Sequence, residues 1–218
     1  MYYLSQKIEN TFKSLSQDNL NAIKIKYDGK VFSYNEIALL LIDVQAQFCD
    51  PEHEYREGNR ETQETSERIQ RIAPIFREAS IPLYVVYTEP QPRIYMFQPD
   101  YKKDTIINKY GNSPFDETQI EENLHESNKK LLLVCGFNLS ACVFDTVKDA
   151  LKRSFNVALL EDLSGNGKYF YQGHPNPEEY KKEELLKIKN AGATTVNSEF
   201  FLENLLAQTS EQIKPPKL

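Results

Sequence analysis

The sequence lacks the segments that secreted, membrane-bound and nucleic-acid-binding proteins require. No apolar run in its 218 residues approaches the length of a bilayer-spanning helix, and the first residues, MYYLSQKIENTF, lack the apolar core of a signal peptide. The net charge is -6, and 26 basic residues are interleaved with 32 acidic ones, so no basic stripe can follow a phosphate backbone. We therefore expect a cytoplasmic protein without a membrane or nucleic-acid partner.

Cysteine is scarce as well. The three cysteines, Cys49, Cys135 and Cys142, form an odd set without Cys-x-x-Cys spacing. This excludes a disulfide framework and a structural zinc cluster, and it suits a reducing compartment. Any chemistry that involves cysteine is therefore expected from a single thiol.

No stretch rich in proline, glycine or serine divides the chain, and its length suits one α/β domain. We expect that domain over residues 37–208, preceded by an extension (1–36) and followed by a flexible tail (209–218). The extension contains a predicted amphipathic helix (8–20) and a β-hairpin (23–32) around Asp28-Gly29, a strong turn signal. Because an isolated hairpin is marginally stable, we expect the extension to pack on the domain.

The rest of the chain alternates between apolar runs and amphipathic segments. Strands are predicted at 38–42, 81–87, 105–108, 131–136, 157–160 and 194–196, and helices at 61–79, 117–126, 141–153, 178–190 and 199–207. This alternation predicts a three-layer α/β/α sandwich around a mainly parallel six-stranded sheet, of the Rossmann-like type. Such sheets bind ligands beyond the carboxyl ends of their strands.

Three reactive side chains fall at such strand ends. Asp43 and Lys109 each follow a predicted strand, and Cys142 lies in the first turn of the helix after the fourth strand. Alone, each has an ordinary explanation, as a polar strand end, a solvated loop residue or a packed thiol. Together they supply a base, a cation and a nucleophile, and a helix N-terminus favours thiolate over thiol. Cys135, inside an apolar run, is expected in the core.

Three segments resemble the isochorismatase-like cysteine hydrolases, a family that includes nicotinamidases and N-carbamoylsarcosine amidohydrolases. The segments are ALLLIDVQAQF, INKYGNSPFDET and VCGFNLSACVFDTVKDAL, and the resemblance runs from about residue 38 to 206. It implies the isochorismatase-like hydrolase fold, with Cys142 as nucleophile, Asp43 as base and Lys109 holding Asp43 ionised. It also implies an oxyanion hole formed by the backbone N–H groups of Asn138 and Cys142, with a cis peptide between Phe137 and Asn138.

The reaction implied by the resemblance is cleavage of a small non-peptide amide or carbamoyl C–N bond through a thioester, without a cofactor. The family's assemblies imply a homodimer or homotetramer. Residues whose positions face the ligand in relatives, or could cap it, are Gln45, Phe48, Tyr87, Phe115 and Phe137, together with Tyr110 and the segment 93–97.

The sequence departs from the family at two places. Leu139 stands where members often have threonine, which leaves the substrate open. Nicotinamidases of the family bind a metal through an Asp-x-His pair and a further histidine, whereas this chain has only Asp50 and His53 after the first strand, so no metal is expected. The segment 165–177 is too long for a tight turn and is interpreted as a lid or a subunit contact.

Two other functions stay open at this point. One is hydrolysis of a vinyl ether, as in isochorismatases, although relatives with that activity need no cysteine. The other is a binding module that uses the N-terminal helix and hairpin as its contact surface. Alkylation separates the cysteine hydrolase from the binding module: a nucleophilic Cys142 should react faster than Cys49 or Cys135, and Asp43→Asn or Lys109→Ala is expected to slow that reaction.

Overall fold

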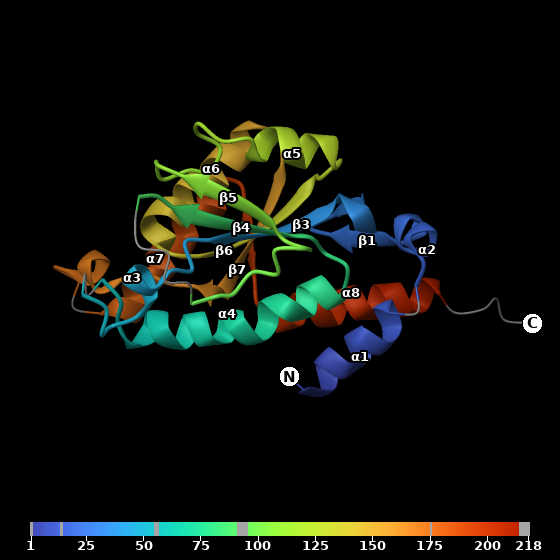
Figure 1. The fold of residues 1–218 in the computed structure, drawn as a ribbon, viewed down its shortest axis with the longest axis horizontal. Coiled ribbons are helices and arrows are strands. Elements are labelled where there is room, and N and C mark those ends of the chain that lie inside the picture. The colour runs from blue at the N-terminus through green and yellow to red at the C-terminus, as the bar shows by residue number, and fades with distance from the viewer. Residues whose placement is uncertain (1, 14, 55–56, 91–95, 175, 214–218) are drawn as a thin grey trace, which may run out of the picture.

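A six-stranded parallel sheet forms the centre of the computed structural model, which describes residues 2–13, 15–54, 57–90, 96–174 and 176–213 (Figure 1). Its spatial order is β5-β4-β3-β6-β7-β8, and every neighbouring pair is parallel. The strands are β3 (Ile37–Ile42), β4 (Leu83–Thr88), β5 (Thr105–Lys109), β6 (Leu131–Gly136), β7 (Asn156–Ser164) and β8 (Thr194–Val196). The predicted α/β sandwich is therefore confirmed, and its sheet is parallel throughout.

Helices cover both faces of the sheet (Figure 1). Helices α4 (Arg60–Glu78) and α8 (Ser198–Gln212) lie on one face, and α5 (Ile120–Glu126), α6 (Phe144–Lys152) and α7 (Pro177–Asn190) on the other. In β3, Leu39 and Leu41 pack toward the first layer, while Leu40 and Ile42 pack toward the second. Because both faces are covered, all six residues of β3 are buried, which is why the strand reads as a continuous apolar run.

The described residues of the N-terminal extension form two α-helices, a hairpin and a short 3-10 helix, η1 (Tyr34–Glu36). The single helix predicted over 8–20 is wrong in extent: α1 (Tyr2–Phe12) ends within that range, and α2 (Gln17–Ala22) starts anew because the Ser16 side chain caps it by accepting the N–H of Asn19. The predicted hairpin is confirmed as β1 (Lys24–Tyr27) and β2 (Lys30–Ser33). Asp28 and Gly29 have φ of 48° and 71°, as a two-residue hairpin turn requires.

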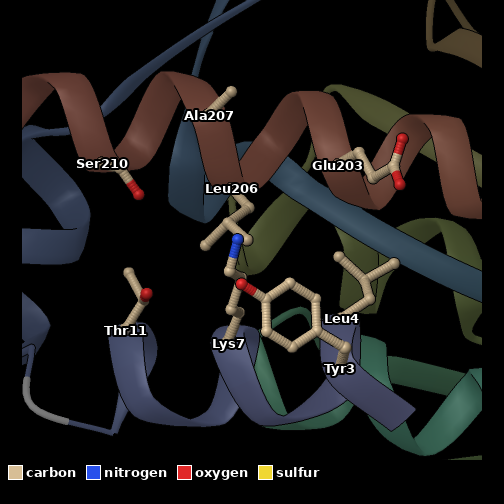
Figure 2. Close-up of a pocket in the computed structure, with 8 residues that line it drawn as sticks. All are labelled: Tyr3, Leu4, Lys7, Thr11, Glu203, Leu206, Ala207 and Ser210. Atoms are coloured by element: carbon tan, nitrogen blue, oxygen red, sulfur yellow. The ribbon is translucent and has the colours of Figure 1, made fainter. Parts of the chain in front are cut away.

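Helix α1 joins the core through one face and borders a groove with the other. Leu4, Ile8 and Phe12 are buried in the same apolar cluster as α4 and α8. Figure 2 shows the groove of about 550 Å³ between α1 and α8, with Tyr3 and Lys7 on its α1 side. The Lys7 ammonium lies 4.3 Å from the centre of the Tyr3 ring. The extension thus shares the core of the domain.

Two glutamines of α8 complete the outer edge of the hairpin. Gln208 and Gln212 each accept a backbone N–H of β1 and return a hydrogen bond to the carbonyl of the same residue: Gln208 pairs with Lys26 (2.7 and 3.1 Å) and Gln212 with Lys24 (2.9 and 2.6 Å). The side-chain amides therefore take the place of a neighbouring strand. Residues 209–212, predicted to belong to a flexible tail, are helical for this reason, and residues 214–218 lie outside the described residues.

The double variant Gln208→Ala/Gln212→Ala removes all four of these hydrogen bonds. We expect the free energy of unfolding to fall by about 1–2 kcal/mol, since the freed backbone groups of β1 are accessible to water. Urea unfolding measures the loss, and hydrogen exchange should accelerate at the amides of Lys24 and Lys26. Glu211→Ala on the same helix is the control, and equal exchange in both variants would show that the glutamines do not hold the strand.

None of the described helices combines the length and the apolarity needed to cross a bilayer.

Candidate active site

The three side chains singled out from the sequence meet at the carboxyl edge of the sheet. The Lys109 Nζ lies 2.8 Å from Asp43 Oδ2 and 3.4 Å from Cys142 Sγ. The side chains of Asp43 and Lys109 have no exposed surface, whereas Cys142 is partly accessible. The structure thus brings a buried ion pair into contact with the thiol of a partly exposed cysteine.

The topology explains why these residues meet. β3 and β6 are neighbours although two other strands lie between them in sequence, so the chain reverses its direction across the sheet here, and the ends of β3 and β6 carry Asp43 and Cys142. Lys109 ends β5, which is two strand spacings, about 10 Å, away from β3. A long side chain is needed to cross that distance, which lysine supplies.

Thr88, at the end of the intervening strand β4, is a site residue that the sequence did not predict. Its Oγ1 accepts a hydrogen bond of 2.7 Å from Lys109 Nζ, and the carbonyl of Gly111 accepts another of 3.0 Å. These two acceptors fix the ammonium between Asp43 and Cys142. The signal for Thr88 was available, because it directly follows the predicted strand 81–87 and is polar.

Cys142 lies in a π-helical turn, η2 (Leu139–Val143), that precedes α6, and not in the first turn of an ordinary α-helix as predicted. The N–H of Val143 donates to the carbonyl of Asn138 over 3.1 Å. The peptide bond between Phe137 and Asn138 is cis, as the family resemblance implied.

Gly136 permits the close approach of β6 to β3 just before this turn. It has a φ of 121°, and a Cβ at this position would lie 2.0 Å from the carbonyl oxygen of Ile42. That oxygen accepts the N–H of Phe137 at 2.9 Å. Only glycine fits here, and its absence of a side chain keeps the turn with Cys142 next to Asp43.

The start of the segment 165–177 braces the η2 turn. The N–H of Leu139 donates to the carbonyl of Gly165 (2.8 Å), and the N–H of Gly167 donates to Asn138 Oδ1 (2.7 Å). The fully buried Asn166 binds Ser140 twice, accepting its N–H (2.9 Å) and donating to its Oγ (2.8 Å). In place of a lid, these first residues form a fixed support for the turn.

Burial decides the protonation state of the thiol. Burial, followed by the charge of Asp43, raises the pKa of Cys142 to about 12, and Lys109 opposes this only in part. The thiol is therefore protonated at neutral pH. The sequence-based prediction that the helix N-terminus favours a thiolate here is wrong. Burial also raises the pKa of Asp43, with Lys109 acting in the opposite direction.

Three of the five predicted pocket residues have structural roles. Gln45 is fully buried, and its amide group pairs with the backbone of Thr88, accepting its N–H (2.8 Å) and donating to its carbonyl (3.3 Å). Tyr87 is buried in the α4 layer and donates to the carbonyl of Phe97 (3.4 Å). Phe137 is buried in the same layer. Alternation along β4 turns Thr88, and not Tyr87, toward Lys109, so Tyr87 lies on the other side of its strand.

Phe115 is buried in the layer of α5, α6 and α7. Its carbonyl accepts a hydrogen bond from Arg153 (3.4 Å), and its ring packs near Phe155, with ring centres 6.0 Å apart. Cys142 packs against the same apolar cluster, so Phe115 stays a pocket candidate.

Phe48 remains a pocket candidate, because it is partly buried and lies in α3 (Ala46–Cys49), which begins three residues after Asp43. Tyr110 is largely exposed, and Phe97 is buried in the core. Residues 93–95 of the predicted cap lie outside the described residues.

The residues considered for a metal form a turn. Asp50 Oδ1 accepts the backbone N–H of Glu52 (2.8 Å), and the Asp50 carbonyl accepts the backbone N–H of His53 (3.2 Å). In the described part of the chain, no group of three histidine, cysteine or acidic side chains is placed to hold a metal ion.

Comparison with known proteins assigns the family. Among curated proteins, the chain is 25% identical over 176 residues to the uncharacterized isochorismatase family protein YrdC of Bacillus subtilis, covering 75% of this chain and 88% of that protein. A cysteine hydrolase from Pseudomonas syringae pv. phaseolicola has a TM-score of 0.73 at 16% identity, covering 85% of this chain and 98% of that one. The N-carbamoylsarcosine amidase of Thermoplasma acidophilum has a TM-score of 0.60 at 18% identity, with coverages of 75% and 96%.

These structural likenesses show a shared fold, in agreement with the isochorismatase-like architecture predicted from the sequence. Residues 37–199, most of the chain, match the family model of the isochorismatase domain. The chain therefore belongs to the isochorismatase family of hydrolases.

Proposed function

We propose that this protein is a cysteine hydrolase that cleaves a C–N bond of a small amide or carbamoyl compound through a thioester on Cys142. The observation that carries the proposal is the contact of one buried ammonium, that of Lys109, with both the Asp43 carboxylate (2.8 Å) and the Cys142 thiol (3.4 Å). The names of two structural relatives, a cysteine hydrolase and an N-carbamoylsarcosine amidase, agree with this chemistry.

The first step follows from the protonation states. Because the thiol of Cys142 is protonated at neutral pH, Asp43 takes its proton as the sulfur attacks the carbonyl carbon. The S–C bond forms, and the electron pair of the C=O double bond moves to the oxygen. Lys109 stays between the two groups and stabilises negative charge on whichever carries it.

Two backbone N–H groups are suited to hold the resulting oxyanion. Around the η2 turn, the N–H groups of Leu139, Ser140, Ala141 and Val143 are all engaged in turn or tertiary hydrogen bonds. Asn138 and Cys142 are the donors of none of these four bonds. These are the two donors that the family resemblance implies, and each such donor typically contributes two to three orders of magnitude, or about 3–4 kcal/mol, to the rate.

Collapse of the intermediate breaks the C–N bond, and Asp43 returns its proton to the departing nitrogen, which leaves as ammonia or an amine. A water molecule then attacks the thioester while Asp43 takes one of its protons. The S–C bond breaks, the acid departs, and the proton passes to the sulfur. The raised pKa of Asp43 suits a group that alternates between base and acid in this way.

Turnover should depend on Cys142. In a screen of small amides, carbamoyl compounds and ureides for ammonia release, Cys142→Ala is expected to lower kcat by at least about a thousandfold, because no thioester can form. Intact mass spectrometry should detect an acyl adduct on the wild-type protein only. Cys135→Ala, a change in the core, is the matched control and should keep its activity. Ammonia release unaffected by Cys142→Ala would refute the thioester route.

Alkylation tests the electrostatics of the thiol without a substrate. Asp43→Asn removes the carboxylate that raises the pKa of Cys142, so iodoacetamide at pH 7.5 should label Cys142 faster, by about threefold for each pKa unit lost. This sign is opposite to the one expected from the sequence. Peptide mass spectrometry measures the rate, with the buried Cys49 and Cys135 as internal controls. Slower labelling would mean that Asp43 activates the resting thiol.

The pH dependence of turnover tests the base. Burial raises the pKa of Asp43, so the acid limb of kcat/KM should lie above the range of an ordinary aspartate, with activity lost as the pH falls through it. Lys109→Met removes the cation that favours the carboxylate, and it should move this limb to still higher pH. An unchanged limb in the variant would exclude Asp43 as the titrating base.

A further inference from the structure

Asn112 places a hydrogen-bond acceptor at the mouth of the site. It lies three residues after Lys109, in the loop whose Gly111 carbonyl accepts from the Lys109 ammonium (3.0 Å). Its side chain is exposed, and its Oδ1 lies 3.9 Å from Cys142 Sγ. Asn112 is therefore an exposed polar side chain close to the thiol, whereas the Asp43–Lys109 ion pair is buried.

The orientation of the Asn112 amide follows from its second contact. Its Nδ2 donates to Asp145 Oδ2 over 3.0 Å, in the first turn of α6. A carboxylate only accepts hydrogen bonds, so the NH₂ end of the amide must face Asp145 and the carbonyl end must face the sulfur. The Lys148 ammonium lies 3.6 Å from the same carboxyl group. The acceptor at the thiol is thus set by the fold.

Apart from the Asp43 carboxylate, which takes the proton of the thiol, the other polar groups around the sulfur are donors. Lys109 contributes an ammonium, and the proposed oxyanion hole contributes two backbone N–H groups, all of which suit a carbonyl oxygen. An oxygen acceptor among them suits a different part of the substrate, one that carries an N–H. An amide presents both features on adjacent atoms, whereas an ester presents only the first.

The distances agree with this assignment. In an attacking geometry the carbonyl carbon lies about 3 Å from the sulfur, and the nitrogen bonded to it lies within about 4 Å. With Oδ1 3.9 Å from the same sulfur, an N–H donor on that nitrogen is within hydrogen-bonding reach.

We infer that Asn112 Oδ1 accepts a hydrogen bond from the N–H of the leaving nitrogen, and that it selects primary and secondary amides or carbamoyl compounds over esters and fully substituted amides. This inference rests on the proposed function. Asn112 is then a specificity-determining residue, and Asp145 is a positioning residue that acts through it. The contact also turns the lone pair of the leaving nitrogen away from Asn112, which favours its protonation by Asp43.

The test compares three substrates that share an acetyl group: p-nitroacetanilide, which carries the N–H, its N-methyl derivative, which lacks it, and p-nitrophenyl acetate. Asn112→Ala should lower kcat/KM for p-nitroacetanilide about five- to tenfold, the value of one net hydrogen bond, and change the other two by less than twofold. Asp145→Ala should lower it about two- to threefold, because the amide of Asn112 is then free to rotate. Glu126→Ala, which removes an exposed carboxylate at the end of α5, is the control and should change none of the three.

The outcomes separate this inference from the proposed function. Equal losses on all three substrates would make Asn112 a structural residue and overturn the inference alone. Wild-type hydrolysis of the ester without that of the anilide would also overturn it, since no preference for N–H would exist. If the wild type cleaves none of the three and Cys142 is not acetylated, the proposed function fails, and the inference fails with it.

Discussion

The buried ion pair between Asp43 and Lys109 is the interaction on which the rest of the site depends. Moving either charge alone out of water would cost several kcal/mol, so each is tolerated only beside the other. The pair in turn requires fixed strand ends, because its two members come from β3 and β5. Thr88 supplies the acceptor on the strand between them, and Gln45 holds the end of that strand through both groups of its amide.

This pairing also explains the chemistry of the thiol. Much of the positive charge of Lys109 is balanced by Asp43, so the ammonium does not offset the effect of burial on Cys142, and the resting thiol stays protonated. In the proposed turnover, the nucleophile forms as a proton moves to Asp43 during attack on the substrate. The groups beyond this core, the Asn166 support under the η2 turn and the Asn112 amide at the mouth, hold the sulfur and the substrate in relation to that proton transfer.

Much of the fold follows from local pattern. The apolar run over 38–42 predicts a strand covered on both faces, because burial on both faces removes the alternation of polar and apolar residues. Asp28-Gly29 predicts the β1–β2 hairpin, because few other residues adopt the positive φ angles of its turn. The end of α8 could not be read in this way. Its last turn is held by Gln208 and Gln212 against β1, about 180 residues earlier in the chain, and exposed glutamines carry no local sign of such a partner.

The sequence by itself determined the alternating elements and the three residues at the strand ends, because both depend on neighbours in the chain. The tertiary structure decided everything that depends on distance through space: the pKa of Cys142, the burial of Tyr87 in the α4 layer, and the orientation of Asn112 by Asp145. Burial and fixed partners set these properties. A helix start can favour a thiolate, but burial of the sulfur, followed by the charge of the Asp43 carboxylate beside it, outweighs that effect, and only the packed sheet brings both about.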